Sequence, residues 1–230
     1  MLHGELLSGL MLRHDVDGDA HFLTNVVEPL QNPLNRLAKR LADIAISSIV
    51  LLFILPPLCV FVWVIQQRQS TGALFYRQTR HGLGRSTFSI LKFRSMDASN
   101  EAESRQATTD DPRVFPFGRM LRHFSLDEVP QFLNVLKGEM SVIGPRPHLE
   151  KHDDLFEQEI NAYRIRHFVK PGITGYAQVR GFRGEVNSPE QIHQRVQYDI
   201  YYIANWSMKL DLYIACKTVA VLLRPPESAV

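Results

Sequence analysis

The sequence predicts a mainly helical α+β protein, monotopic in a membrane, in which a Pro-kinked re-entrant helix holds a small cytoplasmic domain at the bilayer. Three observations lead to this fold class. Residues 44–65 carry no charged side chain, a run long enough to enter a hydrocarbon core of about 30 Å. Basic residues flank that run on both sides. Helical periodicity dominates the rest of the chain, with short extended segments and Gly/Pro turns between.

Residues 1–32 form an N-terminal tail in this prediction. Its centre, HDVDGDAH, favours a flexible acidic tail over a metal site, because no further ligand is evident downstream. From Asn32 onward, Leu34, Leu37 and Leu41 recur at helical spacing, with basic residues between them. We therefore expect residues 33–68 to form an amphipathic lead-in on the membrane surface followed by the re-entrant helix.

The flanks of the apolar segment favour re-entry over a straight span. Basic residues lie on both sides: Arg36, Lys39 and Arg40 before it, and Arg68, Arg77 and Arg80 after it. Because cytoplasmic flanks are enriched in Lys and Arg, both ends favour the same side of the membrane. Pro56-Pro57 lies at the midpoint, and two prolines remove helix hydrogen bonds and force a kink. A buried helix of a soluble protein is disfavoured, because such helices are rarely apolar all round.

Residues 69–223 form the cytoplasmic domain in this prediction, and residues 224–230 form a short tail. Its elements follow from periodicity and turn residues. We first expect two strands joined by a turn at residues 81–84, then a polar helix and loop over 98–112 and a short helix with Gly118 near its start. A helix over 127–137 ended by Gly138 and a charged helix over 149–168 should follow. The chain should end with a loop and strand opened by Pro171-Gly172 and two helical runs from Ser188 that meet near Asn205.

Composition sets few limits on function. The net charge of +2 does not call for a nucleic-acid partner. The two cysteines lie far apart, without metal-ligand spacing, so neither a disulfide framework nor a cysteine metal site is predicted.

An adjacent acid pair, Asp127-Glu128, is the strongest candidate for chemistry. Adjacent helical residues point about 100° apart, so one carboxylate suits chemistry while the other binds a metal or manages a proton. The competing interpretation is a capping box, in which Ser125 and Glu128 close a helix start. With Asp127 as N-cap instead, Pro130 falls in the first turn at little cost. Either helix start would favour a bound anion.

Basic residues surround this pair in the sequence. Arg146 lies in the rigid loop SVIGPRPH, and Lys92 and Arg94 end a strand in LKFRSM. Arginine guanidinium groups recognise phosphate as planar forks. Two acids among many cations, beside a membrane segment, indicate a phosphorylated substrate and a lipid-borne partner. Because carboxylates alone would repel phosphate, we expect Mg²⁺ to bridge the two.

From about residue 32 to 223 the chain resembles the bacterial sugar transferases, the monotopic polyprenyl-phosphate hexose-1-phosphate transferases. The motifs that carry the resemblance include KRLADI, LFYRQTRHG, FSILKFRSM, DPRVFPFGRMLRHFSLDEVPQFLNVLKGEMSVIGPRP, VKPGITGYAQVRG and the YIANWS region. Larger members of that family carry several membrane spans before this domain. The resemblance therefore suggests that this chain is the bare catalytic unit.

The resemblance implies that residues 69–223 form a phosphosugar transferase domain, which would transfer a sugar phosphate in two steps. The donor would be a UDP-sugar and the acceptor undecaprenyl phosphate. Asp127 would attack the sugar-proximal phosphate, UMP would leave, and the lipid phosphate would then take the phosphosugar from the aspartate. Glu128 would help to hold Mg²⁺ and handle protons. A carboxylate is a competent nucleophile, and phosphoryl transfer depends mainly on positioning and charge neutralisation.

The resemblance also assigns the remaining site residues by family position. The expected phosphate or nucleotide contacts are Arg146, Arg119 and Arg122, with Asp199 as a nucleotide residue and Lys92 and Arg94 as further candidates. Asp127 and Glu128 are the expected catalytic and metal-binding residues, and Pro56 and Pro57 are the expected helix break. For each cation, a surface salt bridge is the alternative role. The proline pair stands where the family sometimes has Ser-Pro.

The GFRGE extension after the strand at Gln178 resembles the undecaprenyl-phosphate glucose phosphotransferase branch of exopolysaccharide synthesis. UDP-glucose is the expected donor, with UDP-galactose or a UDP-N-acetylhexosamine as alternatives. The family often has Trp at the position of Tyr176 and Asn at that of Arg180, so donor preference could differ. We expect a location on the cytoplasmic face of the bacterial inner membrane.

The expected partners are the lipid bilayer, downstream glycosyltransferases and a second copy of the chain, and no nucleic acid. Two rival functions stay open at this point. One is a single-step transfer with Asp127 as a base. The other is an inactive membrane scaffold for glycosyltransferases.

Overall fold

The computed structural model describes residues 11–17, 20–26, 28–97, 111–160, 162–182, 184 and 188–223, with side chains from residue 28 onward. Within these ranges the fold is mainly helical with short two-stranded sheets, as predicted. The strands are β1 (Met11–Asp17), β2 (Ala20–Val26), β3 (Phe75–His81), β4 (Thr87–Phe93), β5 (Ser141–Ile143) and β6 (Gly172–Thr174). The α-helices are α1 (Pro33–Ile49), α2 (Leu55–Gln69), α3 (Pro116–His123), α4 (Phe132–Lys137), α5 (Glu150–Glu159), α6 (Tyr176–Val179), α7 (Pro189–Ala204) and α8 (Met208–Leu223).

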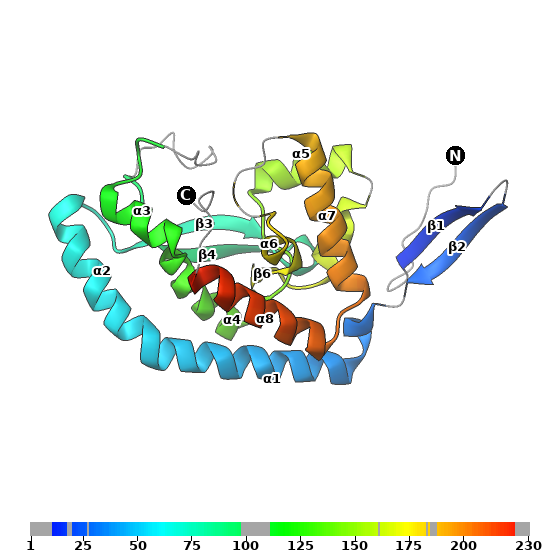
Figure 1. Ribbon diagram of the computed structural model, residues 1–230, viewed down its shortest axis with the longest axis horizontal. Coiled ribbons are helices and arrows are strands. Elements are labelled where there is room, and N and C mark those ends of the chain that lie inside the picture. Colours follow the sequence, from blue (N-terminus) through cyan, green and yellow to red (C-terminus); the bar gives the residue numbers. More distant parts are fainter. Residues whose placement is uncertain are drawn as a thin grey trace.

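One helix from Pro33 to Gln69 runs beneath the rest of the molecule and bends at its middle (Figure 1). It consists of α1, a π-helical turn at Val50–Ile54 and α2. Within this turn the N–H of Leu55 donates to the carbonyl oxygen of Val50. Pro56 and Pro57 follow Leu55, and neither has the N–H group that a helix hydrogen bond requires. Such turns and prolines are known causes of helix bends. The predicted kink is therefore confirmed, and lead-in and apolar segment form one continuous helix.

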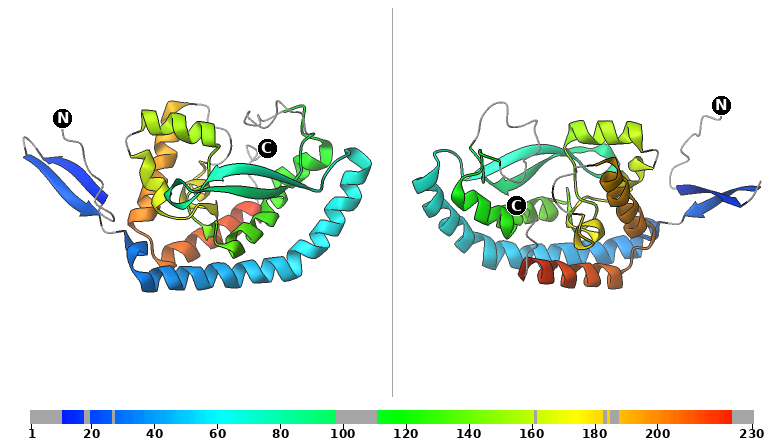
Figure 2. Two further views of the ribbon diagram at one scale, coloured as in Figure 1. Left: turned by 180° about the vertical axis from the view of Figure 1, so that it is seen from behind. Right: turned by 45° about the horizontal axis from the view of Figure 1, so that its top comes forward.

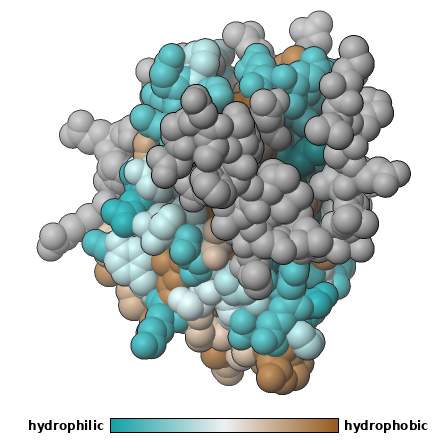
Figure 3. Space-filling model, turned by 90° about the vertical axis from the view of Figure 1, so that its right-hand side faces the viewer, coloured by the Kyte–Doolittle hydropathy of each residue, from teal (hydrophilic) through white to brown (hydrophobic). Residues whose placement is uncertain are grey.

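The buried face of α1 is polar and its exposed face is apolar. Lys39, Asp43 and Ser47, spaced four apart and so on one helix face, are buried. Leu34 and Leu37 are 73% and 55% exposed. Figure 3 shows apolar residues gathered along the lower edge of the molecule, where α1 lies in Figure 1. This is the reverse of a helix on a soluble protein, and it is what a helix with hydrocarbon on its outer side requires.

Buried polar contacts attach α1 to the rest of the domain. Lys39 Nζ lies 2.7 Å from Asp211 Oδ2 on α8, which runs beside α1 (Figure 2). The carboxylate of Asp43 accepts hydrogen bonds from the Ser141 hydroxyl at 3.0 Å and the Val142 N–H at 2.9 Å. Because buried polar groups are costly when unpaired, these contacts fix α1 against α8 and β5.

Several predicted elements are confirmed. Strands β3 and β4 pair antiparallel, with Tyr76 opposite Lys92 and Arg80 opposite Phe88. The helix over 127–137 consists of the 3₁₀ helix η5 (Leu126–Gln131) followed by α4, and Gly138 ends it with φ of 88°. The two C-terminal helices are α7 and α8, with a break after α7 at Asn205.

Other expectations were wrong in detail. Strands β1 and β2 pair antiparallel and stand apart from the domain (Figures 1 and 2). The alternating pattern and the Asp17-Gly18 pair are hairpin signals that the flexible-tail interpretation overlooked. The charged helix over 149–168 ends as α5 at Glu159, and the 3₁₀ helix η6 (Tyr163–Phe168) follows.

The polar helix over 98–112 lies almost wholly outside the described residues, as do the side chains of the HDVDGDAH segment.

Candidate active site

The acid pair lies on η5, in a turn that the capping interpretation did not predict. Ser125 adopts a left-handed conformation with φ of 56°, and its side chain makes no capping hydrogen bond. Glu128 does not reach back to it either, because both of its carboxylate oxygens bond cations elsewhere. The capping-box alternative is therefore wrong, because neither Ser125 nor Glu128 closes the helix start with its side chain.

Glu128 is held by two cations from different elements. Arg146 donates to it through both terminal nitrogens, at 3.1 Å and 2.5 Å, and Lys92 Nζ lies 2.9 Å from Oε1. Burial raises the pKa of Glu128, but Arg146 and then Lys92 outweigh this effect and hold the pKa well below its usual range. Glu128 is therefore an ionised carboxylate at neutral pH, and it orients the side chains of Arg146 and Lys92.

Asp127 has the opposite environment. Its residue is only 8% exposed, and no hydrogen bond to its carboxylate is found within the described part of the chain. Burial, followed by the negative charge of Glu128, raises the pKa of Asp127 to about 6, although Lys92, Arg122 and Arg146 act against this. At neutral pH Asp127 is an ionised carboxylate without a fixed partner, which is the state that a nucleophile or a metal ligand needs.

A Mg²⁺ ion fits these residues only if it is shared with a substrate. Within the described ranges, no group of three or more acidic, His or Cys side chains could cage a metal. Magnesium commonly binds one or two carboxylates and completes its shell with water and substrate phosphates. Asp127 offers one uncommitted carboxylate for this purpose, whereas the oxygens of Glu128 are engaged by Arg146 and Lys92.

Three other arginines that the sequence predicted as site residues have different surroundings. Arg122 on α3 influences Asp127 electrostatically and donates to Met96 Sδ at 3.1 Å. Arg119 is exposed on the same helix. Arg94 instead donates to Ser70 and to the carbonyl oxygen of Ala73, so it braces the segment after α2 and not the acid pair.

The loop that carries Arg146 is fixed by a strand pair of which the sequence predicted only one member, the strand after Pro171-Gly172. Strand β5 pairs in parallel with β6, and the Gly172 N–H donates to the Pro145 carbonyl oxygen at 2.9 Å. On its other side, Arg166 Nη2 donates to the Arg146 carbonyl oxygen at 2.6 Å, while its Nε donates to Asp199 at 2.8 Å. Asp199 is therefore a buried support behind Arg146, with Arg166 between them.

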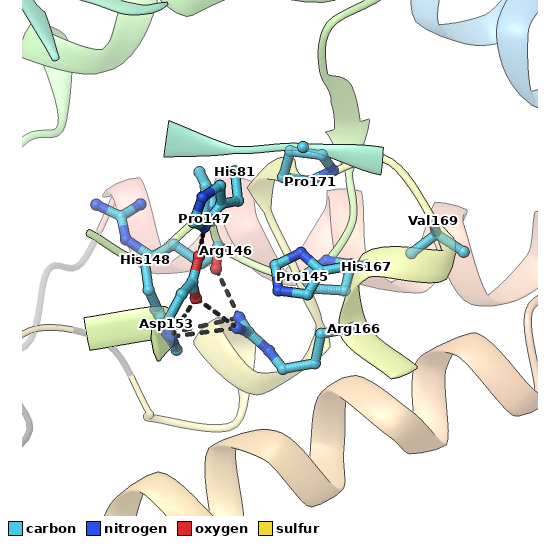
Figure 4. A pocket seen from close by; sticks show the side chains of 11 residues that line it. His81, Pro145, Arg146, Pro147, His148, Asp153, Arg166, His167, Val169 and Pro171 are labelled. Atoms are coloured by element: carbon cyan, nitrogen blue, oxygen red, sulfur yellow. Dashed lines mark hydrogen bonds and ion pairs between the residues drawn. The ribbon is translucent and has the colours of Figure 1, made fainter. Parts of the chain in front are cut away.

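A pocket with about 230 Å³ of empty space, part of it open to solvent, borders the site beside Arg146 (Figure 4). Its wall includes the 145–148 loop, Asp153, Arg166 and His167. Figure 4 shows the Arg166 guanidinium between Asp153, His148 and the Arg146 carbonyl oxygen. Burial and then the charge of Arg166 hold the pKa of His148 well below its usual range, so that imidazole is neutral.

Two further arginines near Arg146 were not recognised as site residues from the sequence. Arg80 belongs to β3 and Arg195 to α7. Burial, followed by repulsion from Arg146, lowers the pKa of each to about 10. Arg80 was treated only as a positive flank of the membrane segment, and no local pattern around Arg195 indicates a site; their proximity to Arg146 arises from tertiary structure.

Comparisons with known proteins show which family the chain is similar to. A family described as bacterial sugar transferase matches residues 34–225. The UDP-glucose:undecaprenyl-phosphate glucose-1-phosphate transferase of Escherichia coli (strain K12) is 46% identical over 81% of this chain and 40% of its own length. The protein of the same name from Caulobacter vibrioides is 42% identical over 85% of this chain and 73% of its own length.

A relative with a different printed donor is also similar. The UDP-N-acetylgalactosamine-undecaprenyl-phosphate N-acetylgalactosaminephosphotransferase of Aeromonas hydrophila is 38% identical over 84% of this chain and 45% of its own length. The chain thus spans less than half the length of the E. coli and Aeromonas proteins. Because the family match covers most of the chain and includes the acid pair and the Arg146 loop, the chain belongs to the bacterial sugar transferase family.

Proposed function

We propose that the chain transfers a hexose-1-phosphate from a UDP-sugar, with UDP-glucose as the first candidate, to undecaprenyl phosphate, with release of UMP. The observation that carries this proposal is the division of roles in the acid pair: Asp127 is buried and uncommitted, while Glu128 is held by Arg146 and Lys92. The names of the E. coli and Caulobacter relatives support the donor and the acceptor. The Aeromonas relative keeps an N-acetylhexosamine donor as the second candidate.

In the first step an Asp127 oxygen bonds the sugar-proximal phosphorus, and the bond from that phosphorus to the bridging oxygen breaks. UMP leaves with the electron pair, and the phosphosugar stays on the aspartate as a mixed anhydride. In the second step an oxygen of the lipid phosphate attacks the same phosphorus, and the bond to Asp127 breaks. Arg146 and Lys92 neutralise phosphate charge, which is the main catalytic demand of such transfers. A Mg²⁺ ion, when bound by Asp127 and the donor diphosphate, would supply further charge neutralisation.

We also propose that the bent helix enters and leaves the inner membrane from the cytoplasmic side, so that the domain meets the lipid phosphate at the surface. The exposed apolar face of α1 and the basic residues at both ends of the long helix support this placement. A product carrying a single sugar on a lipid diphosphate suits the first membrane step of exopolysaccharide assembly, with glycosyltransferases acting afterwards.

The test is UMP release by the purified chain in nanodiscs with Mg²⁺, undecaprenyl phosphate and a panel of UDP-sugars. We expect release from UDP-glucose, loss of release in Asp127→Asn, and full activity in the control Asp154→Asn, which makes the same change at an exposed carboxylate. With donor alone, the intact mass of the wild type should rise by one hexose phosphate.

The alternatives give different results. Release only when lipid phosphate is present, without added protein mass, supports the single-step transfer with Asp127 as a base. Absence of release from every donor overturns the proposed function and supports the scaffold.

A further inference from the structure

Within the described residues, no carboxylate forms an ion pair with Arg80 or Arg195. The Nε atoms of both are buried and have no hydrogen-bond partner. The bonds that they do make go to neutral oxygens, from Arg80 Nη2 to Gln78 Oε1 at 2.5 Å and from Arg195 Nη2 to the Gly184 carbonyl at 3.1 Å. Within the described residues, neither has a carboxylate at ion-pair distance, although Arg195 is only 6% exposed.

Arg146 repels both guanidinium groups more strongly than any single acid attracts them. Each guanidinium lies close enough to Arg146 for repulsion to lower its pKa, after burial has done the same. The acids that attract these two arginines already have other partners: Glu128 pairs with Arg146 and Lys92, Asp199 pairs with Arg166, and Asp153 contacts His81 and Arg166. Because a buried charge without a counterion is costly, the folded chain holds an excess of cationic charge that an anion would relieve.

The position of Arg80 directs this excess toward the acid pair. Tyr76 lies four residues before Arg80 on β3, so both side chains share one face of the strand. Tyr76 is also directly opposite Lys92 on β4, which places Lys92 on that same face of the hairpin. Since Lys92 bonds Glu128, the face that carries Arg80 is the one that looks onto the candidate active site.

We propose that Arg80 and Arg195 join Arg146 in a phosphate-binding subsite that holds the nucleoside phosphate of the donor or the phosphate of the lipid acceptor beside Asp127. The ligand is a phosphate group because a guanidinium fork matches its geometry and because its two negative charges offset the unpaired cations. The three arginines come from β3, the 145–148 loop and α7, so the subsite exists only in the folded chain. This inference rests on the proposed function for the identity of the ligands.

The test combines ligand binding with thermal stability, in nanodiscs, for wild type, Arg80→Gln, Arg195→Gln and the conservative variants Arg80→Lys and Arg195→Lys. UMP affinity is measured by titration calorimetry, and the KM for undecaprenyl phosphate by UMP release. Arg77→Gln is the matched control, because Arg77 is exposed and lies three positions before Arg80, on the opposite face of β3.

We expect the Gln variants to bind the relevant phosphate roughly 10- to 100-fold more weakly, with the control unchanged. Weaker UMP binding assigns the subsite to the nucleotide, and a raised KM for the lipid with normal UMP binding assigns it to the acceptor. Without ligand, the Gln variants should melt at the same temperature as wild type or higher, because an unpaired buried charge has been removed. A purely structural role predicts a lower melting temperature instead.

Normal affinity for UMP and a normal KM for the lipid in both Gln variants would overturn the proposal, as would a lower melting temperature without a change in affinity. If a Gln variant does not fold, the Lys variant carries the test, because it keeps the charge and loses the fork. Wild type that binds UMP through these arginines but releases none from any UDP-sugar would leave the subsite standing while the proposed function fails.

Discussion

Asp127 and Glu128 are neighbouring carboxylates in one 3₁₀ turn, and their surroundings give them different chemistry. Glu128 meets Arg146 and Lys92 directly, so its ionised form is stabilised. Asp127 is desolvated without such a partner, so its ionised form is destabilised and stays reactive. Spacing alone predicted that two adjacent acids would divide their roles, whereas the cations that decide which acid is held come from β4 and from the loop after β5.

The raised pKa of Asp127 predicts a pH-dependent cost in stability. The folded-state pKa of about 6 lies above the ordinary value of 3.8, so the folded chain binds more protons between these values, and its stability falls as pH rises through this window. With Mg²⁺ removed by chelation, Asp127→Asn should exceed wild type by up to about 3 kcal/mol in free energy of unfolding near pH 8. This advantage should vanish below about pH 4.

Chemical denaturation from acid to neutral pH measures this difference. Asp154→Asn, at an exposed site, serves as the control and should show little dependence on pH. An advantage of Asp127→Asn that does not change with pH would contradict the raised pKa.

The clamp on Glu128 predicts an order of stability losses. Arg146→Gln leaves Glu128 buried with Lys92 alone, and we expect a loss of about 2–4 kcal/mol, because an uncompensated buried charge is costly. Lys92→Gln leaves the two-bond contact with Arg146, so a loss of about 1 kcal/mol is expected. Denaturant titration gives both values, and adding Glu128→Gln to Arg146→Gln should recover part of the loss. Equal losses in the two single variants would argue against the clamp.

At the level of elements, the pairing of β5 with β6 positions the loop that carries Arg146. Asp43 of α1 holds the start of β5, and Gly172 of β6 holds Pro145 just after it. The long bent helix and the loop that carries Arg146 are thus attached to the same short strand. Periodicity could not predict this arrangement, because strands of three residues carry too little pattern and the two lie about thirty residues apart.

The close approach of β6 to β5 predicts that Gly172→Ala is disruptive. A Cβ atom on Gly172 would lie 2.1 Å from the Gly144 backbone nitrogen, so the loop to Arg146 would have to move. We expect a loss of stability of about 3 kcal/mol and reduced UMP release. Gly84→Asn is the control, because Gly84 has φ of 60° with nothing within 4 Å of its Cβ position, and Asn tolerates that conformation. Thermal melts of the two variants check this, and equal melting temperatures would refute it.

At the level of the whole molecule, the long helix has its polar face against the domain and its apolar face outward. Lys39 and Asp43 are buried in contacts with α8 and β5, while Leu37 and Leu41 stay exposed. The helix bends at its middle, where the π-helical turn at Val50–Ile54 precedes the prolines. This bend is compatible with the proposed entry into one leaflet.

Re-entry predicts the same side for both ends of the helix. In a background without Cys59 and Cys216, single cysteines at Gln31 and Thr71 should resist a membrane-impermeant maleimide in intact spheroplasts and react once the membrane is opened. Replacing Pro56 and Pro57 with Ala restores the helical ladder and should convert part of the protein to a spanning form. Gln31→Cys then becomes reactive from outside. Reaction of Gln31→Cys from outside without the proline changes would overturn re-entry.

The sequence by itself determined the family, the membrane helix with its kink, the acid pair, and most of the helices, because these depend on composition, spacing and local periodicity. It did not determine that Glu128 would be held and Asp127 left uncommitted, nor that Arg94 would brace another segment while Arg80 and Arg195 approach Arg146. Those outcomes depend on which charges meet across β3, β5 and α7. Interaction energies between buried charges change with distance and solvation, and only the tertiary structure sets both.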